Sequence, residues 1–159
     1  MRVGIGYDSH RFAAGRPLVL GGVTIEHPRG LEGHSDADAV AHAITDAILG
    51  AAGAGDIGAH FPPSDERWRG ADSLALLRAA VAIVAEQNYQ VVNVDVTVIC
   101  EEPRIGPHVS AMRAHLARAL GIAPRLVSVK GKSNEGLGWI GRGEGIAAIA
   151  VAAVDAIAE

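Results

Sequence analysis

The chain lacks the marks of several protein classes. It has one cysteine, Cys100, among 159 residues, so it can form no internal disulfide and no four-cysteine zinc site. No apolar run reaches the ~18 residues that a membrane span needs. The formal net charge of −4 argues against a basic surface for nucleic acid or membrane. With no signal peptide at the N-terminus, we expect a cytoplasmic globular protein without nucleic-acid or membrane partners.

Aromatic residues are few, whereas small residues are abundant. The chain has two each of Trp, Tyr and Phe, but 20 glycines and many alanines. One explanation is a genome that favours Ala, Gly and Arg codons. The other is a set of closely packed elements, with part of the core lying between subunits. We find no repeat, linker or block of like charge, so residues 1–159 are interpreted as one domain.

Hydrophobic periodicity predicts the order β, β, α, α, β, α, β, which is typical of an α/β or α+β fold. Strands are expected at 2–7, 16–25 (a hairpin around Gly21-Gly22), 91–99 and 126–130, and helices at 36–52, from Asp72 or Ser73 onward, and from Pro107 to Gly121. Ser35, followed three residues later by Asp38, resembles a capping box. Residues 53–71 and 131–145 form long Gly-rich loops, which are often functional. The Ala-rich segment 146–157 fits either a helix or a strand.

A metal site is the first chemical hypothesis. Asp8 and His10 lie two residues apart at the end of the first predicted strand, so both side chains project from one face. His42 shares the polar side of helix 36–52 with Asp38 and Asp46 and can supply a third ligand. One carboxylate and two imidazoles suit Zn²⁺ with an open fourth position. The alternative is an ordinary strand-end pair and a surface histidine.

Two nucleotide motifs fail on inspection. Gly136-x-Gly138-x-x-Gly141 matches the dinucleotide fingerprint, but no helix follows it. Gly131-Lys132-Ser133 resembles the end of a P-loop, yet Leu126 stands where the first glycine is needed. Cys100 has no evident partner that would activate it as a nucleophile.

Several features nevertheless favour phosphate binding. They are the loop 130–135, Arg142, the helix start at His34-Ser35 and the loop 56–65. Each is weak alone, but together with a metal site they indicate an enzyme that acts on a phosphorylated compound.

Five longer patterns cover nearly the whole chain. They are R-V-G-x-G-Y-D-S-H from residue 2, G-H-S-D-A-D-A-V-A-H-A-I-T-D-A-I-L-G-A from 33, G-D-I-G-x-H-F-P-P-S-D from 55, N-V-D-V-T-V-I from 93 and N-E-G-L-G-W-I-G-R-G-E-G-I from 134. In this order and spacing they resemble the 2-C-methyl-D-erythritol 2,4-cyclodiphosphate synthase family of the non-mevalonate isoprenoid pathway. The resemblance implies an α/β (α+β) fold whose four-stranded sheet is flanked by helices, and a homotrimer with its sheets around a central cavity. It also implies a strand at 146–157.

The resemblance implies roles for the matching residues. Zn²⁺ is expected on Asp8, His10 and His42, and Mg²⁺ or Mn²⁺ on Glu135. Contacts to the methylerythritol phosphate end are expected from His34, Ser35, Asp56, Gly58 and the closing segment Phe61, Pro62 to Asp65. The cytidine pocket is expected at Cys100 to Gly106, with Arg104 and Ile105. Further substrate contacts are expected from Lys132, Ser133, Asn134, Glu135, Trp139 and Arg142, with His34 and Ser133 as catalytic residues.

One departure concerns the segment before Glu135. Where many family members carry threonines, this chain has Lys132-Ser133-Asn134. Ser133 keeps a hydroxyl, whereas Lys132 adds a charge to which we assign no role. Arg142 and Glu144 would be costly to bury unpaired, so we expect them to pair across a subunit interface.

The reaction that the resemblance implies needs no protein nucleophile. The 2-phosphate of 4-diphosphocytidyl-2-C-methyl-D-erythritol 2-phosphate attacks the β-phosphorus of the same molecule, and CMP leaves. The protein aligns two anions and neutralises developing charge, with Zn²⁺ acting as a Lewis acid. Two alternatives stand beside it: a zinc-dependent phosphohydrolase of a nucleotide-linked diphosphate, and a non-catalytic trimeric ligand-binding module.

Overall fold

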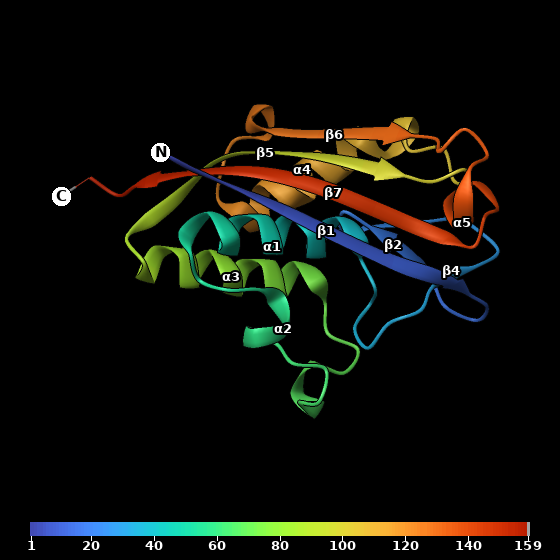
Figure 1. The fold of residues 1–159 in the computed structure, drawn as a ribbon, viewed down its shortest axis with the longest axis horizontal. Helices are drawn as coiled ribbons and strands as arrows, with labels where there is room; N and C mark the ends of the chain where they lie inside the picture. The colour runs from blue at the N-terminus through green and yellow to red at the C-terminus, as the bar shows by residue number, and fades with distance from the viewer. Residues whose placement is uncertain (159) are drawn as a thin grey trace.

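A mixed five-stranded sheet runs the length of the molecule. The computed structural model describes residues 1–158 (Figure 1). Strand order in the sheet is β4-β1-β7-β5-β6, and a separate hairpin pairs β2 with β3. All neighbours in the sheet are antiparallel except β5 and β6, which are parallel. The strands are β1 (Arg2–Ala13), β2 (Leu18–Leu20), β3 (Val23–Ile25), β4 (Gly30–Leu31), β5 (Tyr89–Ile99), β6 (Val127–Lys132) and β7 (Gly145–Ala156).

The three long helices pack on one face of this sheet. In Figure 1, α1 lies directly against β1 and β7, with α3 beyond it, while α4 lies behind them beside β5 and β6. Within residues 1–158, no helix has the length and apolarity to cross a membrane. The helices are α1 (Ala39–Ala52), α2 (Ile57–His60), α3 (Ser73–Glu86), α4 (Val109–Leu120) and α5 (Gly138–Gly141), with 3₁₀ turns η1 (Glu66–Trp68), η2 (Gly106–His108) and η3 (Pro124–Leu126).

Strand β5 confirms the strand that the alternation of apolar and polar residues predicted at 91–99. Val94, Val96 and Val98 are buried against the helices, while Asp95 and Thr97 are partly exposed on the other face. The expected helices also form, with Asp72 capping α3 and a left-handed Gly121 ending α4. The segment 146–157 is a strand, as the resemblance implied. The mixed α/β fold class is therefore confirmed.

Four expectations about the elements need correction. The sheet has five strands and not four, because the two-residue β4 pairs with the end of β1. Strand β1 continues well past residue 7, since β7 supplies a partner as far as Arg11. The loop 53–71 contains the short α2 and η1, each capped by an aspartate. The loop 131–145 likewise begins inside β6 and contains α5.

Asp38, and not Ser35, caps α1. Its carboxylate is fully buried and accepts the N–H of Ala41 at 3.0 Å. It also accepts the N–H groups of Gly21 and Gly22, each at 2.8 Å. Burial raises the pKa of Asp38, although these three backbone hydrogen bonds oppose the rise. Asp38, which was expected on the polar side of the helix, is instead buried, and its hydrogen bonds connect the β2–β3 turn to the start of α1.

Strand β1 approaches α1 very closely at two glycines. A Cβ at Gly6 would collide with the carbonyl group of Ala43, and one at Gly4 would collide with backbone atoms of Ala47 and Ala51. Backbone atoms cannot move aside as a side chain can. Glycine on the strand and alanine on the helix therefore set the separation between these two elements.

We predict that Gly6→Ala lowers the free energy of unfolding by about 3 kcal/mol, the upper end of the usual cost of overpacking. Guanidinium unfolding at one fixed protein concentration measures the change. Gly50→Ala is the matched control, because Gly50 lies in α1 and the nearest atom to its added Cβ is 4.0 Å away. The control should be neutral or slightly stabilising. Equal effects of the two substitutions would contradict the proposed close contact.

Candidate functional site

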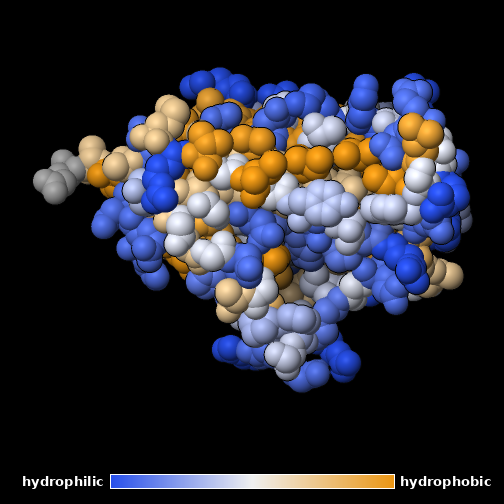
Figure 2. All heavy atoms as spheres, viewed as in Figure 1, coloured by the Kyte–Doolittle hydropathy of each residue, from blue (hydrophilic) through white to orange (hydrophobic). Residues whose placement is uncertain are grey.

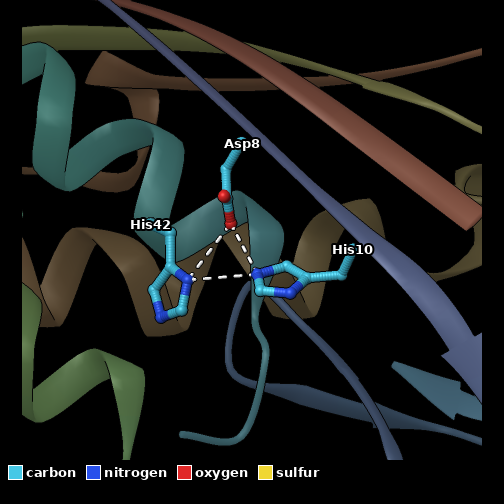
Figure 3. A group of neighbouring side chains, drawn as sticks. All are labelled: Asp8, His10 and His42. Carbon is cyan, nitrogen blue, oxygen red and sulfur yellow. Dashed lines mark hydrogen bonds and ion pairs between the residues drawn. The ribbon is translucent and has the colours of Figure 1, made fainter. Parts of the chain in front are cut away.

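Three side chains converge where β1 passes the start of α1. Asp8 Oδ2 lies 2.7 Å from His10 Nε2 and 3.1 Å from His42 Nδ1. The two imidazole nitrogens are 3.4 Å apart. Figure 3 shows the three groups pointing toward one another, Asp8 and His10 from β1 and His42 from α1. The three atoms lie within 4.8 Å of one another, so together they could hold one metal ion. Asp8, His10 and His42 are called the metal group below.

Outer partners hold both imidazole rings. His10 Nδ1 lies 2.7 Å from the carbonyl oxygen of Glu32, which can only accept, so this nitrogen carries a proton and Nε2 is the one turned toward Asp8. His42 Nε2 lies 2.8 Å from the Ser73 hydroxyl and 3.2 Å from the Ser35 hydroxyl. Both rings thus present one nitrogen to the centre and anchor the other, as metal-binding histidines do.

The charges at this centre favour a cation. Burial acts to raise the pKa of Asp8, but hydrogen bonds from His10 and His42 outweigh it, so the pKa lies below its ordinary value. Burial acts to lower the pKa of His10, and contact with Asp8 reverses the effect and raises it. A negative oxygen between two nitrogens therefore attracts positive charge. A divalent metal supplies that charge, and a carboxylate with two imidazoles fits it. The donor set alone does not distinguish zinc from similar metals.

A cavity of about 240 Å³ opens beside the three ligands. It brings together four of the expected substrate-contact residues with the two histidines of the metal group. The lining includes His10, His34, Ser35, His42, Gly58 and Phe61. Arg16, which the sequence did not single out, donates to the carbonyl groups of Gly33 and Ser35, each at 2.6 Å. It therefore fixes the segment that carries His34.

The loop that closes this cavity is organised by carboxylates. Asp46 accepts the N–H of Ile57 at 2.8 Å and anchors the start of α2 to α1. Asp56 accepts the N–H of Ala59 at 2.8 Å and caps α2. Asp65 caps η1 and pairs with the Arg67 guanidinium at 2.6 Å. Asp56 and Asp65, like Pro62, are not among the residues that line the cavity, so the structure shows the two aspartates as local anchors of the loop.

A second cavity, of about 540 Å³, lies at the far edge of the sheet. It brings together six of the expected residues, namely Cys100, Arg104, Ile105, Gly106, Lys132 and Ser133. Burial and the neighbouring Glu101 raise the pKa of the Cys100 thiol to about 11. The thiol is therefore protonated at neutral pH, which agrees with the expectation that it is no nucleophile.

Glu101 lies within the segment expected to form the cytidine pocket, but the sequence indicated no role for its side chain. Its Oε1 accepts the N–H of Asn134 at 2.9 Å and that of Gly136 at 3.3 Å, on either side of Glu135. Glu135 itself has a φ of 53° in the left-handed region, which is unusual for a residue with a side chain. Such conformations persist where surrounding contacts enforce them, and often at functional sites. Glu135 lines neither cavity described above.

Trp139 and Arg142 line neither of these cavities. Trp139 lines a third cavity of about 580 Å³, together with Ser9, Arg11 and Glu144, and this cavity shares His10 with the first. Arg142 donates to Glu144 at 3.1 Å from Nε and lies within 3.0 Å of it through its terminal nitrogen. The two side chains therefore pair within the chain, and their pairing across a subunit interface stays a prediction.

Three strand spacings separate the two halves of the expected site. Asp8 faces Ala148 in the register of β1 and β7, and Ala148 faces Val98 of β5. Val98 in turn faces Gly131 of β6, which lines the second cavity. At about 4.8 Å per strand this places Asp8 about 14 Å from Gly131. Within one chain, the metal group and the second cavity are thus on different parts of the sheet.

Comparison with known proteins identifies relatives along the whole chain. The model of the YgbB family matches residues 1–155. A 2-C-methyl-D-erythritol 2,4-cyclodiphosphate synthase from Symbiobacterium thermophilum is 59% identical over 154 residues, which cover 97% of this chain and 98% of that protein.

Solved structures agree with the sequence relatives. A 2C-methyl-D-erythritol-2,4-cyclodiphosphate synthase in its CDP-bound form matches with a TM-score of 0.88 and 39% identity, covering 97% of this chain and 100% of the other. A CDP complex of IspF from Plasmodium falciparum matches with a TM-score of 0.86 and 35% identity, covering 99% and 97%. Family model, sequence identity and fold agree over nearly every residue, and the chain therefore belongs to the YgbB family, the family of the 2-C-methyl-D-erythritol 2,4-cyclodiphosphate synthases.

Proposed function

We propose that the chain converts 4-diphosphocytidyl-2-C-methyl-D-erythritol 2-phosphate to 2-C-methyl-D-erythritol 2,4-cyclodiphosphate and CMP in isoprenoid precursor synthesis. The observation that carries the proposal is the convergence of Asp8, His10 and His42 beside a cavity lined by His34 and Ser35. Its relatives are synthases of this name, and two of the matching structures hold CDP. We place the reaction in the cytoplasm, as the sequence predicts.

The cavity beside the metal group suits the methylerythritol phosphate end of the substrate. Its wall combines polar groups with the aromatic edge that Phe61 and Trp68 form, their rings 5.1 Å apart. An aromatic wall excludes water from a reacting phosphate, which favours cyclisation over hydrolysis. We assign to this end His34, Ser35, Asp56, Gly58, Phe61, Pro62 and Asp65, with His34 acting on the reacting phosphate as a catalytic residue.

The second cavity suits the cytidine diphosphate end. Arg104 and Lys132 at its rim offer positive charge, and the hydroxyl of Ser133 can donate to a phosphate oxygen as charge develops. Besides these three residues, we assign Cys100, Ile105, Gly106, Asn134, Glu135, Trp139 and Arg142 to substrate binding, with Ser133 as the second catalytic residue.

The donor sets indicate which residues would hold metal ions. Asp8, His10 and His42 would hold Zn²⁺, and Glu135 would hold Mg²⁺ or Mn²⁺, since an isolated carboxylate prefers a hard cation. Bound there, the two ions would neutralise negative charge on the diphosphate. The residues that line the two cavities have the other role in the reaction, which is to position the substrate. They align two mutually repelling anions in line, and proximity of this kind can supply several kcal/mol of a barrier. The nucleophile is the substrate's own phosphate, so no protein base is required.

A homotrimer would join the two halves of the site. Five apolar side chains on β1 and β7 project from the sheet face opposite the helices, with exposed fractions between 37% and 70%. They are Val3, Ile5, Tyr7, Ile149 and Val151. Figure 2, which has the same view as Figure 1, shows an apolar stripe across this face of the molecule, where β1 and β7 lie. Ile5 faces Val151 and Tyr7 faces Ile149 in the strand register, so the stripe is continuous. Apolar stripes of this kind mark contacts between subunits.

Turnover tests the function directly. We expect the purified protein, given the cytidylyl substrate, Zn²⁺ and Mg²⁺ in ¹⁸O-water, to release CMP and a cyclic diphosphate that carries no solvent oxygen. His42→Ala removes a metal ligand from the partly exposed side of α1 and should reduce the rate at least ~10³-fold while the fold is kept. His115→Ala on α4 is the control, since His115 lines neither cavity, and should retain the parental rate.

The products separate this proposal from its alternatives. A linear phosphate with solvent ¹⁸O would show a phosphohydrolase. Intact substrate after incubation with both metals would show a binding module. A fully active His42→Ala variant would show that the metal lies elsewhere.

We predict that Ile5→Lys dissociates the assembly, because it places a charge in the apolar stripe. Sedimentation equilibrium should give the parent three times the chain mass of 16.4 kDa and the variant a smaller mass. Ile157→Lys is the control, since Ile157 is a comparably exposed apolar residue, at 45%, that lies outside the stripe. A parent that sediments as a single chain would overturn the trimer.

A further inference from the structure

A chain of contacts leads from His42 away from the metal group to a carboxylate. The hydroxyl of Ser73 lies 2.8 Å from His42 Nε2 and also contacts Asp36 Oδ1. The backbone N–H of Ser73 donates to Asp36 Oδ2 at 3.0 Å. Ser73 is the first residue of α3 and is fully buried, and Asp36 lies in the segment that precedes α1. The contacts therefore join three elements behind the imidazole.

The direction of each hydrogen bond follows from the chemistry of its partners. An ionised carboxylate only accepts, so the Ser73 hydroxyl donates its one proton to Asp36. The hydroxyl oxygen can then only accept from His42, which requires the proton of the imidazole to be on Nε2. With a metal ion bound at the metal group, the lone pair is consequently on Nδ1, the nitrogen that lies 3.1 Å from Asp8 Oδ2.

His10 reaches the opposite arrangement by a different route. Its Nδ1 donates to the Glu32 carbonyl oxygen, so with a metal ion bound its lone pair is on Nε2. The two histidines thus need opposite tautomers to point both lone pairs at one centre, and the fold supplies a separate acceptor for each. The Ser35 hydroxyl is a weaker candidate for the His42 proton, because it lies farther away, at 3.2 Å, and is also within reach of the N–H of Ala37.

We infer that Asp36 and Ser73 are positioning residues, which set the tautomer and orientation of His42 as a metal ligand. The inference rests on the proposed metal site and adds two residues to it. His34 and Ser35 line the substrate cavity, whereas Asp36 and Ser73 do not. Partners of this kind typically change metal affinity by about 10- to 100-fold when they are removed.

Ser73→Ala tests the inference, because it removes the hydroxyl and leaves the backbone N–H that holds Asp36. Zinc affinity, measured by competition with a chromogenic chelator, should fall about 10- to 100-fold. Asp72→Ala is the matched control. Asp72 caps the same helix by accepting the N–H of Leu74 at 3.0 Å, but it does not contact His42. The control should lose thermal stability and keep zinc affinity within about twofold of the parent.

A second measurement needs no variant. In the zinc-loaded parent with ¹⁵N-labelled histidine, NMR should show a slowly exchanging proton on Nε2 of His42, and the Asp72→Ala protein should retain it. A folded Ser73→Ala protein with parental zinc affinity, or a parent without this protected proton, would overturn the inference and leave the metal site standing. A parent that binds no zinc would overturn the metal site and the inference with it.

Discussion

The site depends on how closely one strand approaches one helix. Gly4 and Gly6 let β1 contact the backbone of α1 at Ala43 and Ala47. Asp8 follows these glycines on the same face of β1, and His42 precedes Ala43 on α1. The short backbone separation therefore brings a carboxylate and an imidazole within 3.1 Å. A larger side chain at either glycine would separate the ligands as well as the elements.

The same contact explains the unusual composition. Alanine is the side chain that lets a helix approach a sheet without leaving a gap, and buried alanines recur on α1 and on β7, against which it packs. The opposite face of the sheet carries larger apolar side chains, and within residues 1–158 none of the three long helices packs on it. One face thus builds the metal group within the chain. The other is suited to a second copy, which would bring a neighbour's cavity to that group.

Local patterns in the sequence predicted most elements but not their number or partners. The alternation in β5 and the capping and termination of α3 and α4 depend on neighbouring residues, so they could be identified directly. The strand β4 has only two residues and forms because β1 is available to it, which no local pattern records. The Ala-rich β7 was ambiguous by itself, since alanine favours a helix and only pairing with β1 and β5 makes it a strand.

The candidate metal ligands could be predicted because their residue types and spacing are themselves the chemical signal. The residues that position the candidate site by hydrogen bonds could not be predicted in this way. Asp36 and Ser73 are 37 positions apart, and Glu101 and Asn134 are 33 apart, so only the fold brings them together. Asp38 was expected on the polar side of helix 36–52 and is the buried cap of α1. A carboxylate near a helix start fits either role, and the position of the β2–β3 turn decides between them.

In the proposed assembly, the metal group of one chain meets the cytidine pocket of another. A crystal structure with Zn²⁺ and CDP, recorded at the zinc absorption edge, tests this arrangement most directly. We expect an anomalous peak between Asp8, His10 and His42, with the diphosphate beside it and the cytidine in the cavity around Arg104 of a neighbouring chain. A peak elsewhere, or a cytidine bound in the cavity of the same chain as the nearest zinc, would contradict it.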